Sequence, residues 1–153
     1  MIPYEMEHLF TYSAAVREPV VVSPPGEGDI RINFYVAEGK AWGPKLKGRL
    51  LPVGADWMTL RTDGMAVLDV RAAIETDDGA HIDVVYNGLL DMGHDGYARF
   101  QKGEIPELVR IHAAPRLRTA HPDYVWLNRL QCVNVGEGRL RQNQVTYDVY
   151  ALR

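Results

Sequence analysis

The sequence is poor in the features that mark several functional classes. Its single cysteine, Cys132, excludes an internal disulfide and a cysteine-cluster zinc site, and its apolar neighbours predict a buried, inert thiol. No uncharged apolar run approaches the roughly 18 residues that a membrane helix needs. The N-terminal stretch MIPYEMEHLF contains neither a basic leader nor a continuous apolar segment, so we expect a soluble, cytoplasmic protein.

An excess of positive charge is also missing. The net charge of −3 gives no general attraction to phosphate backbones, so we expect no nucleic acid partner. The Arg-Leu-Arg stretches at 116–118 and 139–141 each place two arginines on one strand face, most simply the solvated one.

Sequence motifs of cofactor and metal chemistry are absent as well. The chain has no P-loop, no GxGxxG, no GxSxG and no HExxH pattern, which disfavours nucleotide-dependent and triad chemistry. His81 with Asp83, and His94 with Asp95, are incomplete as metal sites. We therefore expect no cofactor and no metal.

Turn residues at short intervals are what the chain has instead. Fourteen glycines and nine prolines separate short β-rich runs, and the stretch VSPPGEGD at 22–29 is a predicted loop. Helical periodicity is weak, and its best candidate, around 115–123, is broken by two prolines. The pattern predicts one all-β domain over residues 1–153, a sandwich or barrel with little or no helix. The predicted strands are 6–16, 30–37, 46–52, 56–62, 65–76, 80–89, 97–101, 107–113, 124–135 and 139–151.

The first Asp-Gly turn sets the register of two predicted strands. A two-residue loop at Asp63-Gly64 would pair Met58 with Asp69, and Asp56 with Arg71. Opposed residues point to the same face of a sheet. The Asp56 carboxylate and the Arg71 guanidinium would then form a cross-strand pair.

The second turn, in the stretch TDDGA, leaves the register open. A two-residue loop pairs Arg71 with Tyr86, and a four-residue loop pairs Asp69 with Tyr86. Both place Tyr86 on the face that carries Asp56 and Arg71, whereas a three-residue loop sends it to the opposite side. The predicted face also carries Asp69 and is otherwise apolar; such a mixture of apolar walls and a few polar groups is typical of a ligand cavity inside a small barrel. Its apolar members are Met58, Leu60, Val67, Ile82 and Val84.

Other polar candidates lie nearer the C-terminus. A three-residue loop at Gly136–Gly138 would place Trp126 and Asn128 on one strand face, which is either cavity or surface. For these two residues, packing and a strand hydrogen bond are the alternatives to ligand binding. His112 is a further candidate for the barrel interior.

Three residues are assigned catalytic roles on this reading. Asp56 would act as general base, Arg71 would tune it or bind a substrate carboxylate, and Tyr86 would donate to a developing oxyanion. An exposed Asp56–Arg71 ion pair and a core Tyr86 are the plainer alternatives. The candidate substrate-binding residues are Trp57, Asp69, Asn87, His112, Trp126 and Asn128.

Several motifs resemble those of a bacterial and fungal family catalogued as a domain of unknown function, number 3237. They are GPKLKGRLLPVGADW at 43–57, RTDGMAVLDVRAAIETDDGAHIDVVYNG at 61–88 and YVWLNRLQCV near the end. The resemblance runs over nearly the whole chain. It implies a single antiparallel β-barrel of about eight to ten strands, similar to allene oxide cyclase and dirigent barrels.

Two functions follow as hypotheses. The first is a cofactor-independent isomerase, cyclase, hydratase or lyase that acts on a small, hydrophobic, oxygenated molecule. The alternative is a non-catalytic carrier barrel for such a ligand. Since both faces of the central strands are partly apolar, we also expect a homo-oligomer, with no membrane partner.

Overall fold

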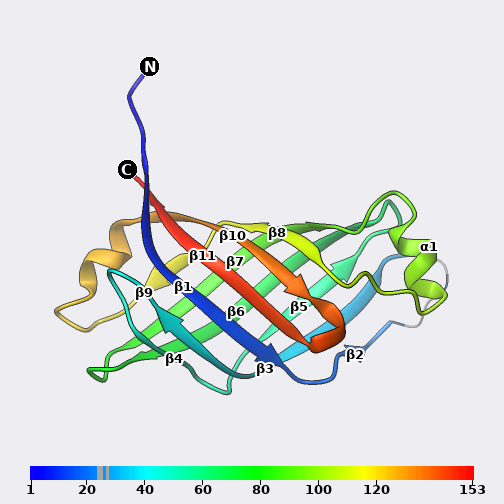
Figure 1. The fold of residues 1–153 in the computed structure, drawn as a ribbon, viewed down its shortest axis with the longest axis horizontal. Helices are drawn as coiled ribbons and strands as arrows, with labels where there is room; N and C mark the ends of the chain where they lie inside the picture. Colours follow the sequence, from blue (N-terminus) through cyan, green and yellow to red (C-terminus); the bar gives the residue numbers. More distant parts are fainter. Residues whose placement is uncertain (24–25, 27) are drawn as a thin grey trace.

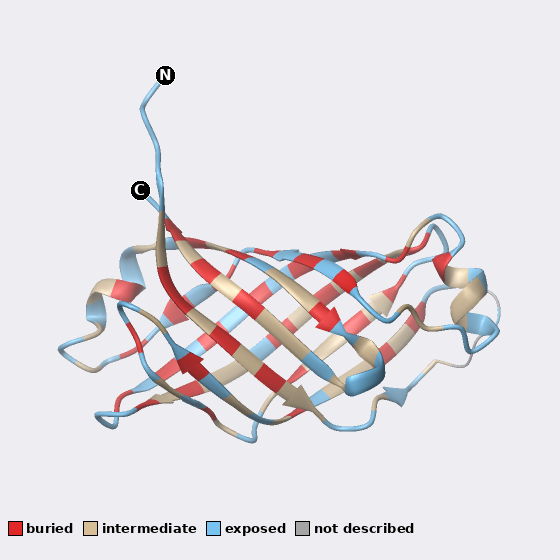
Figure 2. Ribbon diagram, viewed as in Figure 1, coloured by how far each residue is buried: buried red, intermediate tan, exposed pale blue. Residues whose placement is uncertain are grey.

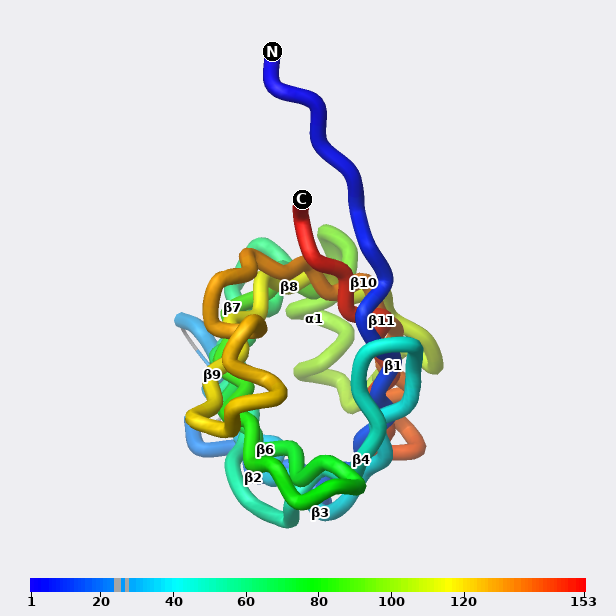
Figure 3. Tube along the Cα trace, turned by 90° about the vertical axis from the view of Figure 1, so that its left-hand side faces the viewer, coloured from blue at the N-terminus to red at the C-terminus, as the bar shows by residue number. Residues whose placement is uncertain are grey.

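Eight antiparallel strands close into a barrel in the computed structural model, which describes residues 1–23, 26 and 28–153 (Figure 1). The strands pair in the order β6-β5-β3-β1-β11-β10-β8-β7, and β7 pairs with β6 to complete the ring (Figure 3). The predicted antiparallel β-barrel is therefore confirmed. The barrel strands are β1 (Met6–Val16), β3 (Ile30–Trp42), β5 (Ala55–Leu60), β6 (Met65–Thr76), β7 (His81–Asp91), β8 (Val109–Ala113), β10 (Gln131–Arg139) and β11 (Gln144–Leu152).

Three short strands extend the rims. They are β2 (Val20–Val21), which pairs with β3, β4 (Gly48–Leu50), which pairs with β3 and β6, and β9 (Arg116–Arg118), which pairs with β7. The helical elements are α1 (Gly96–Gln101) and the 3-10 turns η1 (Val125–Arg129) and η2 (Leu140–Gln142). No helix in the described part of the chain is long and apolar enough to cross a membrane.

Some predicted element boundaries are wrong. The predicted strand at 97–101 is helix α1, and the predicted strand at 124–135 begins as η1. Around 115–123, where at most a helical turn was expected, the chain forms β9. Residues 24, 25 and 27 of the predicted loop at 22–29 lie outside the described residues.

Side-chain alternation places the core inside the barrel. In β7, Ile82, Val84 and Tyr86 are buried while His81 and Asp83 are exposed, and Figure 2 shows this banding on most strands. Full burial of a large apolar side chain stabilises the fold by about 1.5–3 kcal/mol. The largest fully buried side chains are Tyr147, Phe10, Leu9, Ile30, Ile32, Leu60, Leu68, Ile74, Ile82, Ile111, Leu127 and Val149.

The hairpin between β5 and β6 turns through a three-residue loop. The Arg61 N–H donates to the Met65 carbonyl, and Gly64 takes the left-handed conformation (φ 87°) that such a loop requires. Asp56 consequently opposes Val70 rather than Arg71. The predicted Asp56–Arg71 pair is wrong, because one extra loop residue turns β6 over relative to β5.

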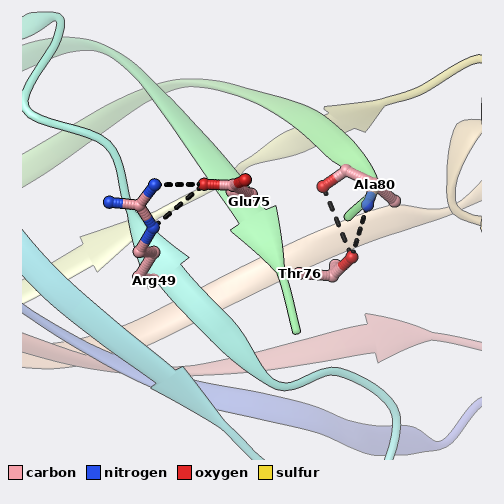
Figure 4. Close-up of polar contacts among 4 residues, drawn as sticks. All are labelled: Arg49, Glu75, Thr76 and Ala80. Carbon is pink, nitrogen blue, oxygen red and sulfur yellow. Dashed lines mark hydrogen bonds and ion pairs between the residues drawn. The ribbon is translucent and has the colours of Figure 1, made fainter. Parts of the chain in front are cut away.

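The hairpin between β6 and β7 also has a three-residue loop. The Thr76 hydroxyl accepts a hydrogen bond from the Ala80 N–H at 2.8 Å, and this bond closes the loop (Figure 4). Next to Thr76, Glu75 forms an ion pair with Arg49 of β4 on the outer surface. Tyr86 therefore opposes Val70. The two register errors cancel for β5 and β7, so Asp56 and Tyr86 do share the inner face.

The last hairpin differs from the prediction because it turns four residues later. Arg139 opposes Gln144, with Asn143 in the left-handed conformation (φ 52°), so Gly136 and Gly138 belong to β10 itself. A Cβ on Gly136 would lie 2.4 Å from the Tyr147 ring, so this glycine makes room for that ring.

Candidate functional site

A cavity of about 70 Å³ lies inside the barrel. This is several times the roughly 10–15 Å³ that one water needs, so the space admits more than a single solvent molecule. Asp56 is the one charged residue among the described residues that line it, and most of the wall is aliphatic or aromatic. The polar lining groups are Asp56, Gln144 and the hydroxyls of Tyr12, Tyr86 and Tyr147.

Asp56 is held at an interruption of the β5–β6 ladder. Pairing is present at Asp56 and resumes at Thr59, but Trp57 and Met58 between them have no partner in β6. The Asp69 N–H, released from the ladder, donates to Asp56 Oδ1 at 3.0 Å. The carboxylate thus replaces a strand carbonyl through Oδ1, and Asp56 also lines the cavity.

Two further side chains satisfy the backbone at this interruption, which we call the ladder gap (residues 57–58 and 68–69). The Arg31 guanidinium of β3 donates to the Trp57 carbonyl. The Asn87 amide of β7 donates to the Leu68 carbonyl at 3.1 Å. Buried backbone groups need such partners, so side chains from two other strands, β3 and β7, support the position of Asp56.

Burial makes the Asp56 carboxyl a weaker acid than an ordinary aspartate. Its removal from water raises the pKa to about 7, and the nearby Asp69 carboxylate acts in the same direction. The Asp69 N–H and the Arg31 cation oppose this rise. At neutral pH the carboxyl is therefore present in both protonated and ionised forms, as a group that both donates and accepts protons should be.

Three buried tyrosines form the other polar part of the cavity. The Tyr12 hydroxyl donates to the Tyr86 hydroxyl at 3.0 Å, and the Asn134 amide nitrogen donates to Tyr12 at 3.4 Å. The Tyr147 ring centroid lies 5.1 Å from that of Tyr12 and 5.9 Å from that of Tyr86. Burial raises the pKa of all three tyrosines, so their hydroxyls stay neutral donors. The negative charge of Asp56 raises the pKa of Tyr12 and Tyr147 further.

The predicted residues Arg71 and Asp69 lie outside the barrel. Their side chains form an exposed ion pair at 3.2 Å, and the Arg71 guanidinium lies 5.7 Å from the centre of the Trp57 ring. Asn87 also points outward and serves the ladder gap. The expectation that Arg71 and Asp69 share the cavity with Asp56 is wrong, because β6 is turned over.

The candidates nearer the C-terminus do not reach the cavity either. His112 is exposed and opposes Leu89 on the outer surface. The Trp126 indole donates to the Asp123 carbonyl, and the Asn128 side chain bonds both backbone groups of Thr119. Both residues stabilise the segment around η1, which is the structural alternative.

Two cavity-lining residues, Tyr12 and Tyr147, and Asn134, which bonds Tyr12, were not among the residues predicted from the sequence. The alternation of β11 places Tyr147 between Val145 and Val149 on the core face, and a tyrosine on such a face needs a hydrogen-bond partner. That signal was available.

Cys132 is fully buried as predicted, and burial raises the pKa of its thiol to about 11. The described residues contain no cluster of three metal-ligating side chains.

Comparison with known proteins agrees with the barrel architecture. Among solved structures, a β-barrel-like protein of Acinetobacter baumannii AYE has a TM-score of 0.83 at 28% identity, covering 100% of this chain and 98% of that one. A structure described as an enzyme from Penicillium herquei has a TM-score of 0.74 at 20% identity, covering 100% and 97% of the two chains, and at this identity it shows the fold alone.

Sequence comparison points to one family. A UPF0311 protein of Rhodopseudomonas palustris is 30% identical over 148 residues, which is 95% of each chain. Residues 4–152 match the family described as "Protein of unknown function (DUF3237)". This match covers nearly the whole barrel, and it agrees with the resemblance carried by the motifs around Asp56 and Tyr86. The chain therefore belongs to the DUF3237 family of β-barrel proteins.

Proposed function

We propose that the protein catalyses a cofactor-independent proton transfer on a small, hydrophobic, oxygenated molecule inside the barrel. Isomerases, cyclases, hydratases and lyases share such a step. The observation that carries the proposal is Asp56, a partly buried carboxyl with a pKa of about 7 in an apolar cavity. Strongly perturbed carboxyls in cavities are candidates for acid–base catalysis.

The groups around Asp56 suit this role. The Asp69 N–H fixes Oδ1, so the carboxyl has a defined orientation and a second oxygen that can take a proton. Neutral tyrosine hydroxyls in the same cavity can stabilise negative charge that develops on a substrate oxygen. Asp56 can afterwards return the proton, and the cycle then consumes nothing.

The position of Arg71 removes an objection to the catalytic reading. A guanidinium paired with Asp56 would have lowered the pKa of the carboxyl and weakened it as a base. Because Arg71 pairs with Asp69 on the outside, burial dominates the environment of Asp56.

Proton exchange provides the test. The protein is incubated in deuterium oxide with a panel of small apolar ketones, aldehydes and phenols, and deuterium incorporation at carbon is followed by mass spectrometry. We expect exchange with the wild-type protein and a rate at least about 100-fold lower with Asp56→Asn, since general base catalysis contributes at least this much.

The matched control is Asp83→Asn, which removes an exposed carboxylate from the outer face of β7. It should exchange at the wild-type rate. Equal rates for the wild-type protein and Asp56→Asn would refute the role of Asp56.

A carrier is the second candidate, favoured by the apolar lining. In that case mass spectrometry of an extract of the denatured protein should recover a bound ligand, and no compound of the panel should undergo Asp56-dependent exchange.

A further inference from the structure

The direction of hydrogen bonding through the tyrosine cluster (Tyr12, Tyr86 and Tyr147) is set by Asn134. The amide nitrogen of Asn134 can only donate, so the Tyr12 oxygen accepts from it at 3.4 Å. The Tyr12 proton is then directed to Tyr86, 3.0 Å away. The hydrogen bonds thus run from Asn134 of β10 to Tyr12 and from Tyr12 to Tyr86.

A chain of this kind ends in an unused donor. The Tyr12 hydroxyl uses its one proton on Tyr86. Among the described residues, the Tyr86 O–H makes no hydrogen bond to an acceptor of its own, and the Tyr147 ring lies beside it at a centroid distance of 5.9 Å. A buried donor without an acceptor is unfavourable, and a ligand oxygen in the cavity would supply the acceptor.

Asn134 itself is an unusual core residue. Its side chain is fully buried, yet Oδ1 has no hydrogen-bond partner among the described residues. An apolar residue of the same size would avoid that loss, so stability does not explain the amide. The one hydrogen bond of this amide goes to the Tyr12 hydroxyl.

The charge of the lining restricts the ligand. Among the described residues, no arginine, lysine or histidine lines the cavity, and Asp56 contributes a negative charge when it is ionised. A carboxylate or phosphate group would be desolvated there without a cationic partner. A neutral acceptor such as a carbonyl oxygen meets no such penalty.

We infer that the tyrosine cluster binds the carbonyl oxygen of a small apolar ketone or aldehyde, with Asn134 as a positioning residue that turns the free O–H toward it. This inference rests on the proposed function and narrows its substrate class. Asp56 would take a proton from the carbon next to the carbonyl. The C–H electron pair then forms a C=C bond, and the carbonyl π electrons move to the oxygen, where the tyrosine O–H stabilises them. Return of the proton to carbon or oxygen regenerates Asp56.

Two small probes of nearly identical shape, acetone and isobutene, suit the size of the cavity and test the inference without requiring turnover. Calorimetry should show that the wild-type protein binds acetone at least about 10-fold more tightly than isobutene, the equivalent of one hydrogen bond. In Tyr86→Phe this ratio should fall to near one while isobutene affinity is kept. The control, Tyr150→Phe, changes a tyrosine outside the cavity lining and should keep the ratio.

Infrared spectroscopy tests Asn134. The carbonyl stretch of bound acetone should lie at lower frequency in the wild-type protein than in Asn134→Leu, because an oriented O–H weakens the C=O bond. Isobutene should bind both proteins equally. If Asn134→Leu does not fold, Tyr86→Phe decides the inference.

Equal affinity for the two probes, or binding of neither, would overturn the inference. The proposed function can fail separately. Asp56-dependent exchange without a ketone preference overturns only the inference, whereas a ketone preference with exchange that ignores Asp56 overturns only the proposed function.

Discussion

Asp56→Asn should be more stable than the wild-type protein above neutral pH. The native pKa of Asp56 is about 7, against 3.8 for an unperturbed aspartate. Since the native state binds this proton more tightly than the unfolded state, its contribution is fully present below about pH 4 and is lost as pH rises to about 7. At about 1.4 kcal/mol per pKa unit, the loss is on the order of 4 kcal/mol.

Urea unfolding at about pH 4 and about pH 8.5 measures this effect. The two proteins should have similar free energies of unfolding at the lower pH, and the variant should be more stable by about 2–4 kcal/mol at the higher pH. The amide side chain of the variant keeps an Oδ1 that accepts the Asp69 N–H, so the hydrogen bond at the ladder gap is retained. Equal stability at both pH values would contradict the raised pKa.

Comparison with the variant also removes opposing contributions. Ion pairing and hydrogen bonds lower the pKa values of three other carboxyls, those of Glu7, Asp63 and Asp78. The contribution of these carboxyls to the stability of the folded protein is therefore lost as pH falls, not as it rises. They are common to both proteins. The difference between the two curves therefore reports on Asp56.

Gly54→Ala should destabilise the barrel by about 3–5 kcal/mol, which is the upper range for single substitutions. Gly54 has a φ of 87°, and a Cβ at this position would lie 2.0 Å from the Arg71 carbonyl oxygen. That oxygen belongs to the backbone of β6, so either the strand or the start of β5 must shift. Asp56 lies two residues further on, so the carboxyl would move as well.

Gly79→Ala is the matched control for this substitution. Gly79 has a similar φ of 91°, but no atom lies within 4 Å of the added Cβ. Its cost should be limited to the left-handed conformation, about 1–2 kcal/mol. Chemical denaturation of both variants separates the two effects, and an equal loss would show that the contact with β6 is harmless.

The strand faces of β5 and β7 could be predicted from sequence, but the face of β6 could not. Period-two alternation of apolar residues marks the inner side of Met58, Leu60, Ile82 and Val84. An Asp-Gly pair, however, fits both a two-residue and a three-residue loop. The choice depends on contacts that close the turn, such as the Thr76 hydroxyl to Ala80. One extra residue in the loop between β5 and β6 places Arg71 on the surface and not in the expected cavity.

The tyrosine cluster could not be predicted from local sequence patterns, for another reason. Tyr12 opposes Tyr147 because β1 pairs with β11 and closes the barrel between the two ends of the chain. Alternation predicts which side of each strand is apolar, but not which distant strands become neighbours. Asp56 and Tyr86 lie on strands close in sequence, and they alone of the predicted catalytic residues line the cavity.

The ladder gap couples chemistry to architecture. The carboxyl proposed to move protons is also the acceptor that secures the Asp69 backbone in the barrel wall. Each protonation of Asp56 weakens that attachment, because a neutral carboxyl is a poorer acceptor than a carboxylate. If Asp56 moves protons as proposed, the Asp69 segment of the barrel wall should therefore be held less firmly for as long as Asp56 carries the proton.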